Sequence, residues 1–300
     1  MPFASNPYDA LKGLSRYLRQ FRDKTFVVKL GGEVLDEPES RRRVVEQLSV
    51  LWTLSIRLVI VHGGGTRLDS LCQQMGLPIE KQGGRRVTSP EVLEAAKMVF
   101  KGGTNMDLLA ELNRSGVPAV GLSGVDAGMI QARKRAPIYV GEENGQPKLF
   151  DYGMVGDIDK VDTTLLKHLL DNDYVPVIAP LTGNHEGQVF NTNADTIASE
   201  VAAALGAEKL FFVLKVPGLL KDVKNSASLI TFATLARLDE MEARQELSGG
   251  MLPKVASIRG ALNQGVRSIH LVSGVQSDAI LVEIFTNEGA GTMIVKDSES

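Results

Sequence analysis

The feature that most constrains the fold is a unit that occurs twice near the start of the chain. A short apolar segment is followed by clustered glycines and then by a segment with helical spacing of its apolar residues. The apolar segments are residues 25–30 and 57–61, and the glycines are Gly31-Gly32 and Gly63 to Gly65. Continuous apolar character over a few residues is typical of strands buried on both faces. The two units therefore predict a parallel sheet with crossover helices, which is an α/β fold.

The rest of the chain continues this alternation. Further helices are predicted at 39–55, 66–75, 90–101, 104–115, 162–171, from Asn193 onward, and at 234–246, 253–264 and 278–285. Further strands are predicted at 118–122, 128–132, 174–179, 209–214, 267–272 and 291–295. Residues 7–22 predict an amphipathic helix, and residues 131–160 predict hairpins or a lid over a pocket. A Gly/Pro-rich centre suggests two lobes with a boundary near residue 180, although a single continuous sheet would give the same signal.

Composition excludes several classes of function. Basic and acidic residues number 33 and 36, so no positive field for binding nucleic acid is expected, and only 5% of residues are aromatic. A single cysteine, Cys72, excludes an intrachain disulfide and a cysteine zinc cluster, and the four histidines have no metal-ligand spacing. No apolar run approaches the roughly 20 residues of a membrane helix, and the N-terminus does not resemble a signal peptide. We therefore expect a cytoplasmic protein with no metal site, nucleic-acid partner or membrane segment.

The two glycine loops predict a phosphate site. Lys29 stands near the end of a buried strand, where an ammonium group is costly unless it reaches a partner. Glycines after a strand let the backbone approach a ligand, and ligands of open α/β sheets bind at the carboxyl ends of strands. The loop that follows His62 fits neither the Walker A nor the Rossmann spacing. We expect backbone amides and Lys29 to hold a phosphate, and His62 to be packed or hydrogen-bonded rather than a base. The alternative is a solvated lysine beside two tight turns.

Four further polar residues are candidates for a site. Arg86 could bind a carboxylate through two parallel hydrogen bonds, although its spacing alone favours a surface arginine. Asn191 and Asp195 flank Asn193, a predicted helix N-cap, and Asp195 suits the helix dipole. Lys254 falls in the first turn of a predicted helix, where a cation opposes the dipole. That position suggests an anionic partner for Lys254; the alternative is an exposed lysine.

Nine segments in order resemble the motifs of the amino acid kinase family, over about residues 10–295. They are Lys29-Leu-Gly-Gly, His62-Gly-Gly-Gly, Gly84-Arg-Arg-Val-Thr, Ala119-Val-Gly-Leu-Ser-Gly-Val-Asp, Val155-Gly-Asp, Pro176-Val-Ile-Ala-Pro, Asn191-Thr-Asn-Ala-Asp, Gly249-Gly-Met-Leu-Pro-Lys and Glu283-Ile-Phe-Thr-Asn-Glu-Gly-Ala-Gly-Thr. The Arg-Val-Thr and Asn-x-Asn-Ala-Asp segments are similar to the branch that acts on N-acetyl-L-glutamate. The resemblance implies an open, mainly parallel sheet in a three-layer αβα sandwich. It also implies an N-terminal interlacing helix (1–24), an N-lobe for acyl amino acid binding and dimerisation (25–180) and a C-lobe for ATP (181–300).

The implied reaction is phosphoryl transfer from ATP with Mg²⁺ to the side-chain carboxylate of N-acetyl-L-glutamate, a step towards arginine. By resemblance, Lys29 and Lys254 neutralise the transferring group, Asp195 fixes both lysines, and the amides of Gly32 and Gly64 bind its oxygens. The implied substrate-binding residues are Gly63, Gly64, Gly65, Arg86 and Asn191. The implied nucleotide-binding residues are Lys29, Gly31, Gly32, Lys215, Gly218 and Lys254. A carboxylate nucleophile is already ionised, so positioning and charge stabilisation suffice, which fits a chain poor in histidine and cysteine.

One departure from the family pattern concerns the nucleotide site. Where the family has Thr-Asp after the strand at 209–213, this chain has Leu214-Lys215. Lys215 reverses the local charge, so it either binds a phosphate or weakens catalysis. A smaller departure is Thr66, where proline commonly follows the glycines.

The N-terminal helix carries a second implication of the resemblance. In arginine-inhibited relatives such a helix interlaces dimers into a hexamer, a trimer of dimers, and arginine binds near it. The residues where that effector site would form are Tyr17, Lys209, His270, Glu283 and Gly289. The alternative is an ordinary docking helix with no effector.

Two other functions stay open at this point. One is a different kinase of the same fold, acting on aspartate, on a nucleotide or on aminoadipate attached to a carrier protein. Arg133-Lys134-Arg135 is too short to argue strongly for a docking face for such a carrier. The other is a degenerate kinase that senses arginine or acetylglutamate and regulates a partner, which Lys215 favours and the intact set of Lys29, Asp195 and Lys254 opposes.

Overall fold

The computed structural model describes Ser15 and residues 17–143, 146–222, 225, 228–247 and 251–297. Of the helix predicted at 7–22, Ser15 and residues 17–21 are described and are helical, and the remainder lies outside the described residues. Gly249 and Gly250, which precede Met251 in one of the family-like motifs, also lie outside them.

An eight-stranded sheet forms the centre of the fold. Its order is β16-β18-β17-β13-β1-β2-β10-β5, and every neighbouring pair is parallel except β17 with β18. The strands are β1 (Thr25–Leu30), β2 (Arg57–His62), β5 (Ala119–Ser123), β10 (Val175–Ala179), β13 (Lys209–Leu214), β16 (Phe232–Thr234), β17 (Ser268–Ser273) and β18 (Thr292–Val295). The predicted open, mainly parallel sheet is confirmed. Because β1 lies between β2 and β13, the strand order reverses beside β1, and such a point favours a ligand-binding crevice.

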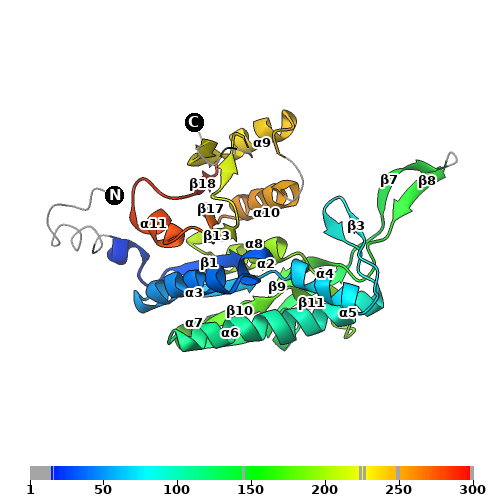
Figure 1. Ribbon diagram of the computed structural model, residues 1–300, viewed down its shortest axis with the longest axis horizontal. Helices are drawn as coiled ribbons and strands as arrows, with labels where there is room; N and C mark the ends of the chain where they lie inside the picture. Colours follow the sequence, from blue (N-terminus) through cyan, green and yellow to red (C-terminus); the bar gives the residue numbers. More distant parts are fainter. Residues whose placement is uncertain are drawn as a thin grey trace.

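Helices cover both faces of this sheet, as expected for a three-layer αβα sandwich (Figure 1). One face carries α3 (Pro38–Thr53), α6 (Asn105–Arg114) and α11 (Ala279–Phe285). The other carries α7 (Thr164–Asp171), α8 (Ala194–Leu205) and α10 (Met251–Asn263). Side chains of a strand alternate between faces. In β1, Phe26, Val28 and Leu30 therefore join the first core, whereas Val27 joins the second.

The helices predicted at 90–101 and 104–115 are continuous, which corrects the prediction of two separate helices. The α-helix α5 (Pro90–Lys97) runs into the π-helical segment η1 (Met98–Thr104), which runs into α6. Gly102 and Gly103, which separate the two predicted helices, both lie within the π-helical segment. A glycine pair weakens a helix without obliging it to end, and π-helical segments are frequent at functional sites.

A second, four-stranded sheet packs beside the first. It consists of β12 (Val189–Asn191), β11 (Leu181–Gly183), β6 (Ile130–Lys134) and β9 (Gly156–Val161). Of the two possibilities predicted for residues 131–160, the hairpins are found. The strands β7 (Ile138–Glu143) and β8 (Gln146–Phe150) form an arm that projects from the body (Figure 1). A shorter hairpin beside it joins β3 (Lys81–Gln82) to β4 (Arg85–Arg86).

Several short elements complete the chain. They are α2 (Gly32–Leu35), α4 (Gly65–Gln74), a 3₁₀ turn at Asp126–Gly128, α9 (Leu235–Ala243) and the pair β14 (Leu219–Leu220) and β15 (Leu229–Ile230). The central sheet takes four strands from residues 25–180 and four from residues 181–300, and it is continuous between them. In the part of the chain that the structure describes, no helix is long and apolar enough to cross a membrane.

Candidate active site

The two glycine loops meet at the carboxyl ends of β1 and β2. A Cβ atom on Gly32 would lie 3.0 Å from the amide nitrogen of Gly64, and a Cβ on Gly64 would lie 2.9 Å from the Phe100 ring. Side chains at these positions would separate the loops, so the close approach requires glycine. No backbone carbonyl of the described residues accepts from the amides of Gly32 or Gly64. The loops therefore offer backbone donors to an anion.

Three charged side chains from distant parts of the chain meet next to these loops. Lys29 shares the sheet face of Val27, which α8 and α10 cover, because side chains alternate along β1. Its Nζ lies 2.8 Å from Oδ1 of Asp195, and Nζ of Lys254 lies 2.6 Å from Oδ2 of the same carboxylate. All three residues are less than a tenth exposed. The structure thus brings together the three residues predicted to form the catalytic set.

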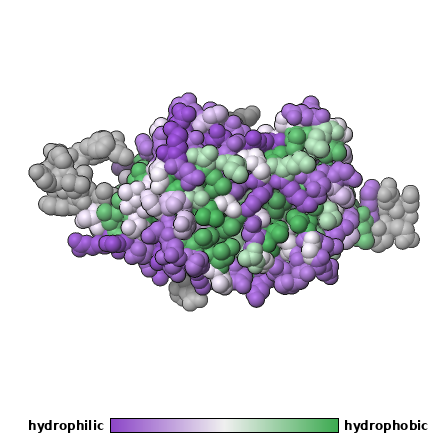
Figure 2. Space-filling model, turned by 90° about the horizontal axis from the view of Figure 1, so that it is seen from below, coloured by the Kyte–Doolittle hydropathy of each residue, from purple (hydrophilic) through white to green (hydrophobic). Residues whose placement is uncertain are grey.

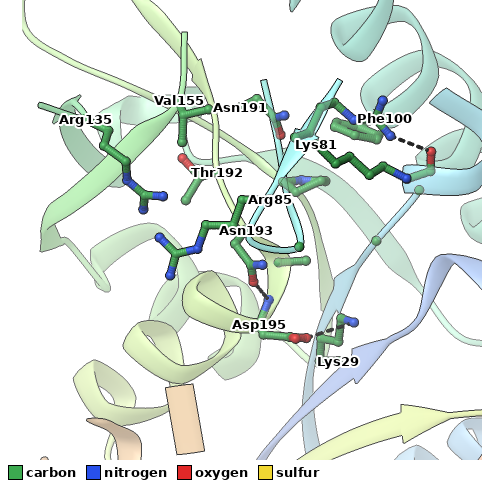
Figure 3. Close-up of a pocket in the computed structure, with 17 residues that line it drawn as sticks. Lys29, Lys81, Arg85, Phe100, Arg135, Val155, Asn191, Thr192, Asn193 and Asp195 are labelled. Carbon is green, nitrogen blue, oxygen red and sulfur yellow. Dashed lines mark hydrogen bonds and ion pairs between the residues drawn. The ribbon is translucent and has the colours of Figure 1, made fainter. Parts of the chain in front are cut away.

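The carboxylate of Asp195 is fixed by its place on α8. Asn193 is the N-cap of this helix, and its Oδ1 accepts from the amides of Asp195, at 2.7 Å, and Thr196, at 3.2 Å. The predicted cap is therefore confirmed. The first turn of α8 then holds Asp195 beside Lys29, as Figure 3 shows.

The electrostatics of this cluster favour an added anion. Burial alone would raise the pKa of Asp195, but Lys29 and Lys254 hold it well below its usual range. Burial lowers the pKa of Lys254, and Asp195 opposes that shift. The Lys254 ammonium also lies 4.9 Å from the centroid of the Phe212 ring, which is within range of a cation–π contact. With both lysines protonated and Asp195 ionised, the three groups carry one net positive charge in a buried setting.

A cavity of about 290 Å³ opens beside Lys29 and Asp195. Its lining includes Lys29, Gly63, Gly64, Gly65, Arg86, Asn191 and Asp195, all of them predicted site residues. Residues that sequence reasoning missed also line it, among them Lys81, Arg85, Phe100, Arg135, Val155, Thr192 and Asn193. Figure 3 shows the Arg85 and Arg135 side chains reaching toward the same side of the cavity. The lining is rich in cations and has one carboxylate, Asp195, so it suits an anionic ligand.

Arg86 lies in the wall of the cavity and has an unsatisfied donor. Its Nη2 donates to the Gly65 carbonyl at 3.0 Å and lies 2.5 Å from Oδ1 of Asp69. Its Nη1 is buried and has no partner among the described residues. A buried donor without an acceptor is costly, so the geometry suits a ligand oxygen at this point.

Asp69, on α4, is the residue that orients Arg86. It also accepts from Lys81 at 2.8 Å. Burial would raise the pKa of Asp69, but hydrogen bonds from Lys81 and Arg86 lower it. Sequence reasoning missed Asp69 because an aspartate on an amphipathic helix is normally a solvated residue.

Asn191 is held by a residue of another motif. Its Nδ2 donates to Oγ1 of Thr88 at 3.0 Å, and Thr88 is fully buried. The Arg-Val-Thr and Asn-x-Asn-Ala-Asp segments, which are far apart in the sequence, therefore meet at one wall of the cavity.

Of the predicted nucleotide-binding residues, Lys29 lines this cavity, whereas the other five lie outside its lining: Gly31, Gly32, Lys215, Gly218 and Lys254. The Gly31 amide donates to the Val213 carbonyl at 3.1 Å. Gly218 packs against Thr292, whose Oγ1 would lie 2.4 Å from a Cβ at this position, so packing alone requires this glycine. Lys215 is exposed after the end of β13.

The five residues of the predicted effector site lie in one region at the opposite end of β13. Nζ of Lys209 lies 2.9 Å from Nε2 of His270, and Nδ1 of His270 lies 2.7 Å from Oε1 of Glu283. Gly289 has a φ of 66°, and a Cβ there would lie 2.7 Å from Oε2 of Glu283. The Tyr17 ring packs edge-on against Phe285 on α11. The Lys209 ammonium lies 5.3 Å from the centroid of the Phe21 ring, so it also contacts the N-terminal helix.

Comparison with known proteins identifies the fold family. The model of the amino acid kinase family matches residues 24–273, which include both glycine loops, Asp195 and Lys254. The chain belongs to the amino acid kinase family. Membership of this kinase family implies the use of ATP.

Relatives within the amino acid kinase family span nearly the whole chain. The acetylglutamate kinase of Myxococcus xanthus strain DK1622 is 58% identical over 299 residues, which are 99% of this chain and 97% of the relative. That of Methanococcus maripaludis strain C6 is 38% identical, over 94% of this chain and 95% of the relative.

Solved structures agree on the fold. N-acetylglutamate synthase from Neisseria gonorrhoeae, in complex with coenzyme A and N-acetyl-glutamate, superposes with a TM-score of 0.82 at 26% identity. The match covers 98% of this chain and 64% of the synthase, so this chain spans about two thirds of that protein. An isopentenyl phosphate kinase, with a TM-score of 0.61 at 18% identity over 90% of this chain and all of the other, shares the fold alone.

Proposed function

We propose that this amino acid kinase transfers a phosphoryl group from ATP to the side-chain carboxylate of N-acetyl-L-glutamate, in arginine biosynthesis. The product is an acyl phosphate, N-acetyl-L-glutamyl 5-phosphate. The observation that carries the proposal is the arrangement of charge in the cavity. A lysine pair held by Asp195 stands beside two glycine loops, and the unsatisfied Nη1 of Arg86 lies in the wall of the same cavity. Near-full-length similarity to acetylglutamate kinases supports it.

The residues present can perform this chemistry without a general base. The attacking carboxylate is ionised at neutral pH, so the chain has to position it and to stabilise charge on the phosphoryl oxygens. Lys29 and Lys254 supply positive charge, and the amides of Gly32 and Gly64 supply hydrogen bonds to those oxygens. Arg86 and Asn191 would bind the α-carboxylate and the acylamino group, and Gly63 to Gly65 would line the same substrate through their backbone.

ATP would bind from the C-terminal half, with its phosphates directed at Lys29 and Lys254. The predicted nucleotide contacts of Gly31, Gly32, Lys215 and Gly218 belong to this proposal. Within the described residues, no group of three or more His, Cys, Asp or Glu side chains could hold a metal ion. Mg²⁺ keeps several waters and commonly binds through substrate phosphates. We therefore expect Mg²⁺ to enter with ATP and to offset phosphate charge.

An acyl-phosphate trap tests the proposed reaction. The purified chain is incubated with MgATP and N-acetyl-L-glutamate, and hydroxylamine converts the acyl phosphate into a hydroxamate, which is detected as its coloured complex with ferric iron. We expect hydroxamate with acetylglutamate and none with glutamate or aspartate. Turnover only with aspartate or with an aminoadipate derivative would assign a different kinase of the fold. Binding of acetylglutamate or arginine without turnover would assign a regulatory protein.

We also propose a homodimer that assembles into a hexamer through the N-terminal helix, with arginine as an effector near Tyr17, Lys209 and Glu283. Apolar side chains gather at the centre of the face in Figure 2, which supports a buried contact between copies. Sedimentation velocity and an arginine titration of activity test this. A dimer that millimolar arginine does not inhibit would contradict the proposal. Because ATP is the phosphoryl donor, we expect the enzyme to work in the cytoplasm.

A further inference from the structure

His62 closes strand β2 and is completely buried, yet it belongs to neither group of charged residues described above. Alternation along β2 puts it on the same face as Leu58 and Ile60, the face that α3 and α6 cover. Lys29 lies on the opposite face, beside α8 and α10. His62 therefore approaches the glycine loop from the side away from Asp195.

Two hydrogen bonds define the tautomer of this ring. Nδ2 of Asn105, on α6, lies 3.0 Å from Nε2 of His62 and 3.0 Å from the Val177 carbonyl. The Val177 carbonyl only accepts, so the atom facing it must be the amide nitrogen of Asn105. That nitrogen donates to His62, so Nε2 of His62 is an acceptor and the proton lies on Nδ1. Nδ1 then donates to the Gly63 carbonyl at 2.9 Å.

The neutral state of the ring follows from its surroundings. Burial is the main cause that lowers the pKa of His62 to about 4; the hydrogen bond to Gly63 opposes this shift, and the positive charges of Lys101 and Lys29 contribute to it. A neutral imidazole has one donor and one acceptor, and both are satisfied here.

The bond to Gly63 has a consequence for the phosphate cradle. The Gly63 carbonyl and the Gly64 N–H belong to one peptide unit, which is planar and trans. Their bonds point in opposite directions, so holding the carbonyl toward the ring directs the Gly64 N–H away from it. The Gly64 nitrogen lies against Gly32, 3.0 Å from the place of a Cβ on that residue. The His62 ring thereby fixes the direction of the Gly64 N–H, which donates to no backbone carbonyl of the described residues.

The structure makes room for Asn105 at a neighbouring strand. A Cβ on Gly121 would lie 2.2 Å from Oδ1 of Asn105, so only glycine at this position of β5 leaves room for the side-chain amide of Asn105. The π-helical segment η1 ends directly before Asn105. Together η1 and Gly121 account for the position of a side chain whose bonds go to His62 and to Val177.

We propose that His62 is a positioning residue that, held by Asn105 as the Nδ1-protonated neutral tautomer, aims the Gly64 amide at the transferring phosphoryl group. This inference rests on the proposed phosphoryl transfer. Gly64 would touch the reacting oxygens, and His62 would act only through the peptide that it orients.

A pair of substitutions separates this role from packing. In His62→Asn the side-chain nitrogen is bonded to Cγ, as Nδ1 is, so a donor to the Gly63 carbonyl remains. In His62→Gln the amide lies one bond farther out, where it can meet Asn105 but leaves Gly63 without its donor. Glutamine is nearer to histidine in size, so a packing role predicts that Asn is the worse replacement. We expect the reverse for kcat, because the Asn variant keeps the amide direction.

The expected result is a fall in kcat of about tenfold to a hundredfold in His62→Gln, with KM for acetylglutamate changed less than threefold, and a recovery of most of that loss in His62→Asn. Variants of His185, an exposed histidine in the β11–β12 turn, to Gln and Asn are the matched controls and should keep full activity. Equal kcat values for the two His62 variants, or a lower value for His62→Asn, would overturn the inference. Absence of turnover in the unsubstituted chain would instead overturn the proposed function.

A measurement on the unsubstituted full chain needs no variant to fold. Long-range ¹H–¹⁵N spectra of histidine-labelled protein distinguish the two neutral tautomers from the imidazolium. The resonance that His62→Asn or, if that variant does not fold, Asn105→Ala removes or shifts most is assigned to His62. We expect protonated Nδ1 and bare Nε2 between about pH 6 and 8. A protonated Nε2 in this range would overturn the inference, whatever the reaction of the protein.

Discussion

Oδ2 of Asp195 accepts a hydrogen bond from Nζ of Lys254 at 2.6 Å, although the two residues are 59 positions apart in the chain. The other oxygen of this carboxylate faces Lys29 at 2.8 Å, so one buried acid holds two buried cations. The sequence position of Lys254, in the first turn of a helix, predicted an anionic partner, and that prediction is confirmed. The arrangement fixes two ammonium groups beside the glycine loops without neutralising both.

Substitution of Asp195 by Asn should impair both turnover and stability. The change keeps the size of the side chain but leaves two buried ammonium groups without a counter-charge. Removing one member of a buried ion pair costs about 3–5 kcal/mol of unfolding free energy, and we expect kcat to fall by about 10²–10³. Urea unfolding and the hydroxamate assay measure the two effects.

The matched control for this change is Asp239→Asn. Asp239 pairs with Arg259 on the surface, with its side chain 58% exposed. Exposed pairs contribute about 0–1 kcal/mol, so the control should change stability little and activity not at all. Wild-type kcat in Asp195→Asn would remove this residue from the proposed machinery.

Replacing either lysine by alanine should reduce catalysis while the fold survives. Each ammonium group would stabilise charge that develops on the phosphoryl oxygens, and loss of one such group typically costs about 2.7–4 kcal/mol of barrier, or 10²–10³ in rate. We expect that loss in both Lys29→Ala and Lys254→Ala, with circular dichroism unchanged. A decrease of less than tenfold in either variant counts against the assignment.

Sequence patterns predicted the central sheet because they report burial directly. Apolar runs such as 57–61 are strands, and the glycines after them lie at the carboxyl ends, where Gly32 meets Gly64. Alternation along β1 even accounts for the side on which Lys29 meets Asp195. The strands, the glycine turns and the facing of their side chains are set by residues that are close in the sequence, and the spacing of apolar residues reports on such local structure.

Other parts of the site depend on contacts between distant segments. Asp69 acquires its importance only because β4 brings Arg86 within 2.5 Å of it. The continuity of α5, η1 and α6 depends on packing that outweighs the low helix propensity of Gly102 and Gly103. His62 has hydrogen bonds to Asn105 and to Gly63. The bond to Asn105 could be predicted only after α6 had been placed against β2. No local pattern carries that information.

Arg86→Lys should weaken substrate binding more than turnover. A lysine keeps the charge but cannot reach Gly65, Asp69 and a ligand oxygen at once, because only the guanidinium is a planar fork. Loss of a charge-assisted hydrogen bond costs about 1.5–3 kcal/mol, so KM for acetylglutamate should rise about 10- to 100-fold. Arg114→Lys, at an exposed site, is the control. An unchanged KM would show that Arg86 does not contact the substrate.

Lys215→Ala tests the residue that departs from the family pattern. Lys215 is exposed and lies outside the cavity lining, so its charge acts through solvent. Exposed charge contacts contribute about 0.2–1 kcal/mol. If Lys215 attracts the phosphates, KM for ATP should rise about two- to fivefold at low salt with kcat unchanged. A kcat that increases on substitution would show instead that this lysine weakens catalysis.

The stability of the protein should fall as the pH decreases from 7 to 5. Burial lowers the pKa of His62 to about 4, and burial also lowers the pKa of His270, whereas an unfolded histidine titrates near 6.5. Below pH 6.5 the unfolded chain therefore binds protons that the folded chain does not, so acid favours unfolding. His62 alone should reduce the unfolding free energy by about 2 kcal/mol at pH 5. Carboxylates with lowered pKa values, such as Asp195, also bind protons more readily in the unfolded chain than in the folded chain, but mainly below pH 5.

Urea titrations at pH 7, 6 and 5 measure the slope of the unfolding free energy against pH. His62→Asn should reduce this slope by about 1.4 kcal/mol per pH unit below pH 6.5, and His185→Asn should leave it unchanged. An unfolding free energy that does not change between pH 7 and 5 would contradict a buried, neutral His62.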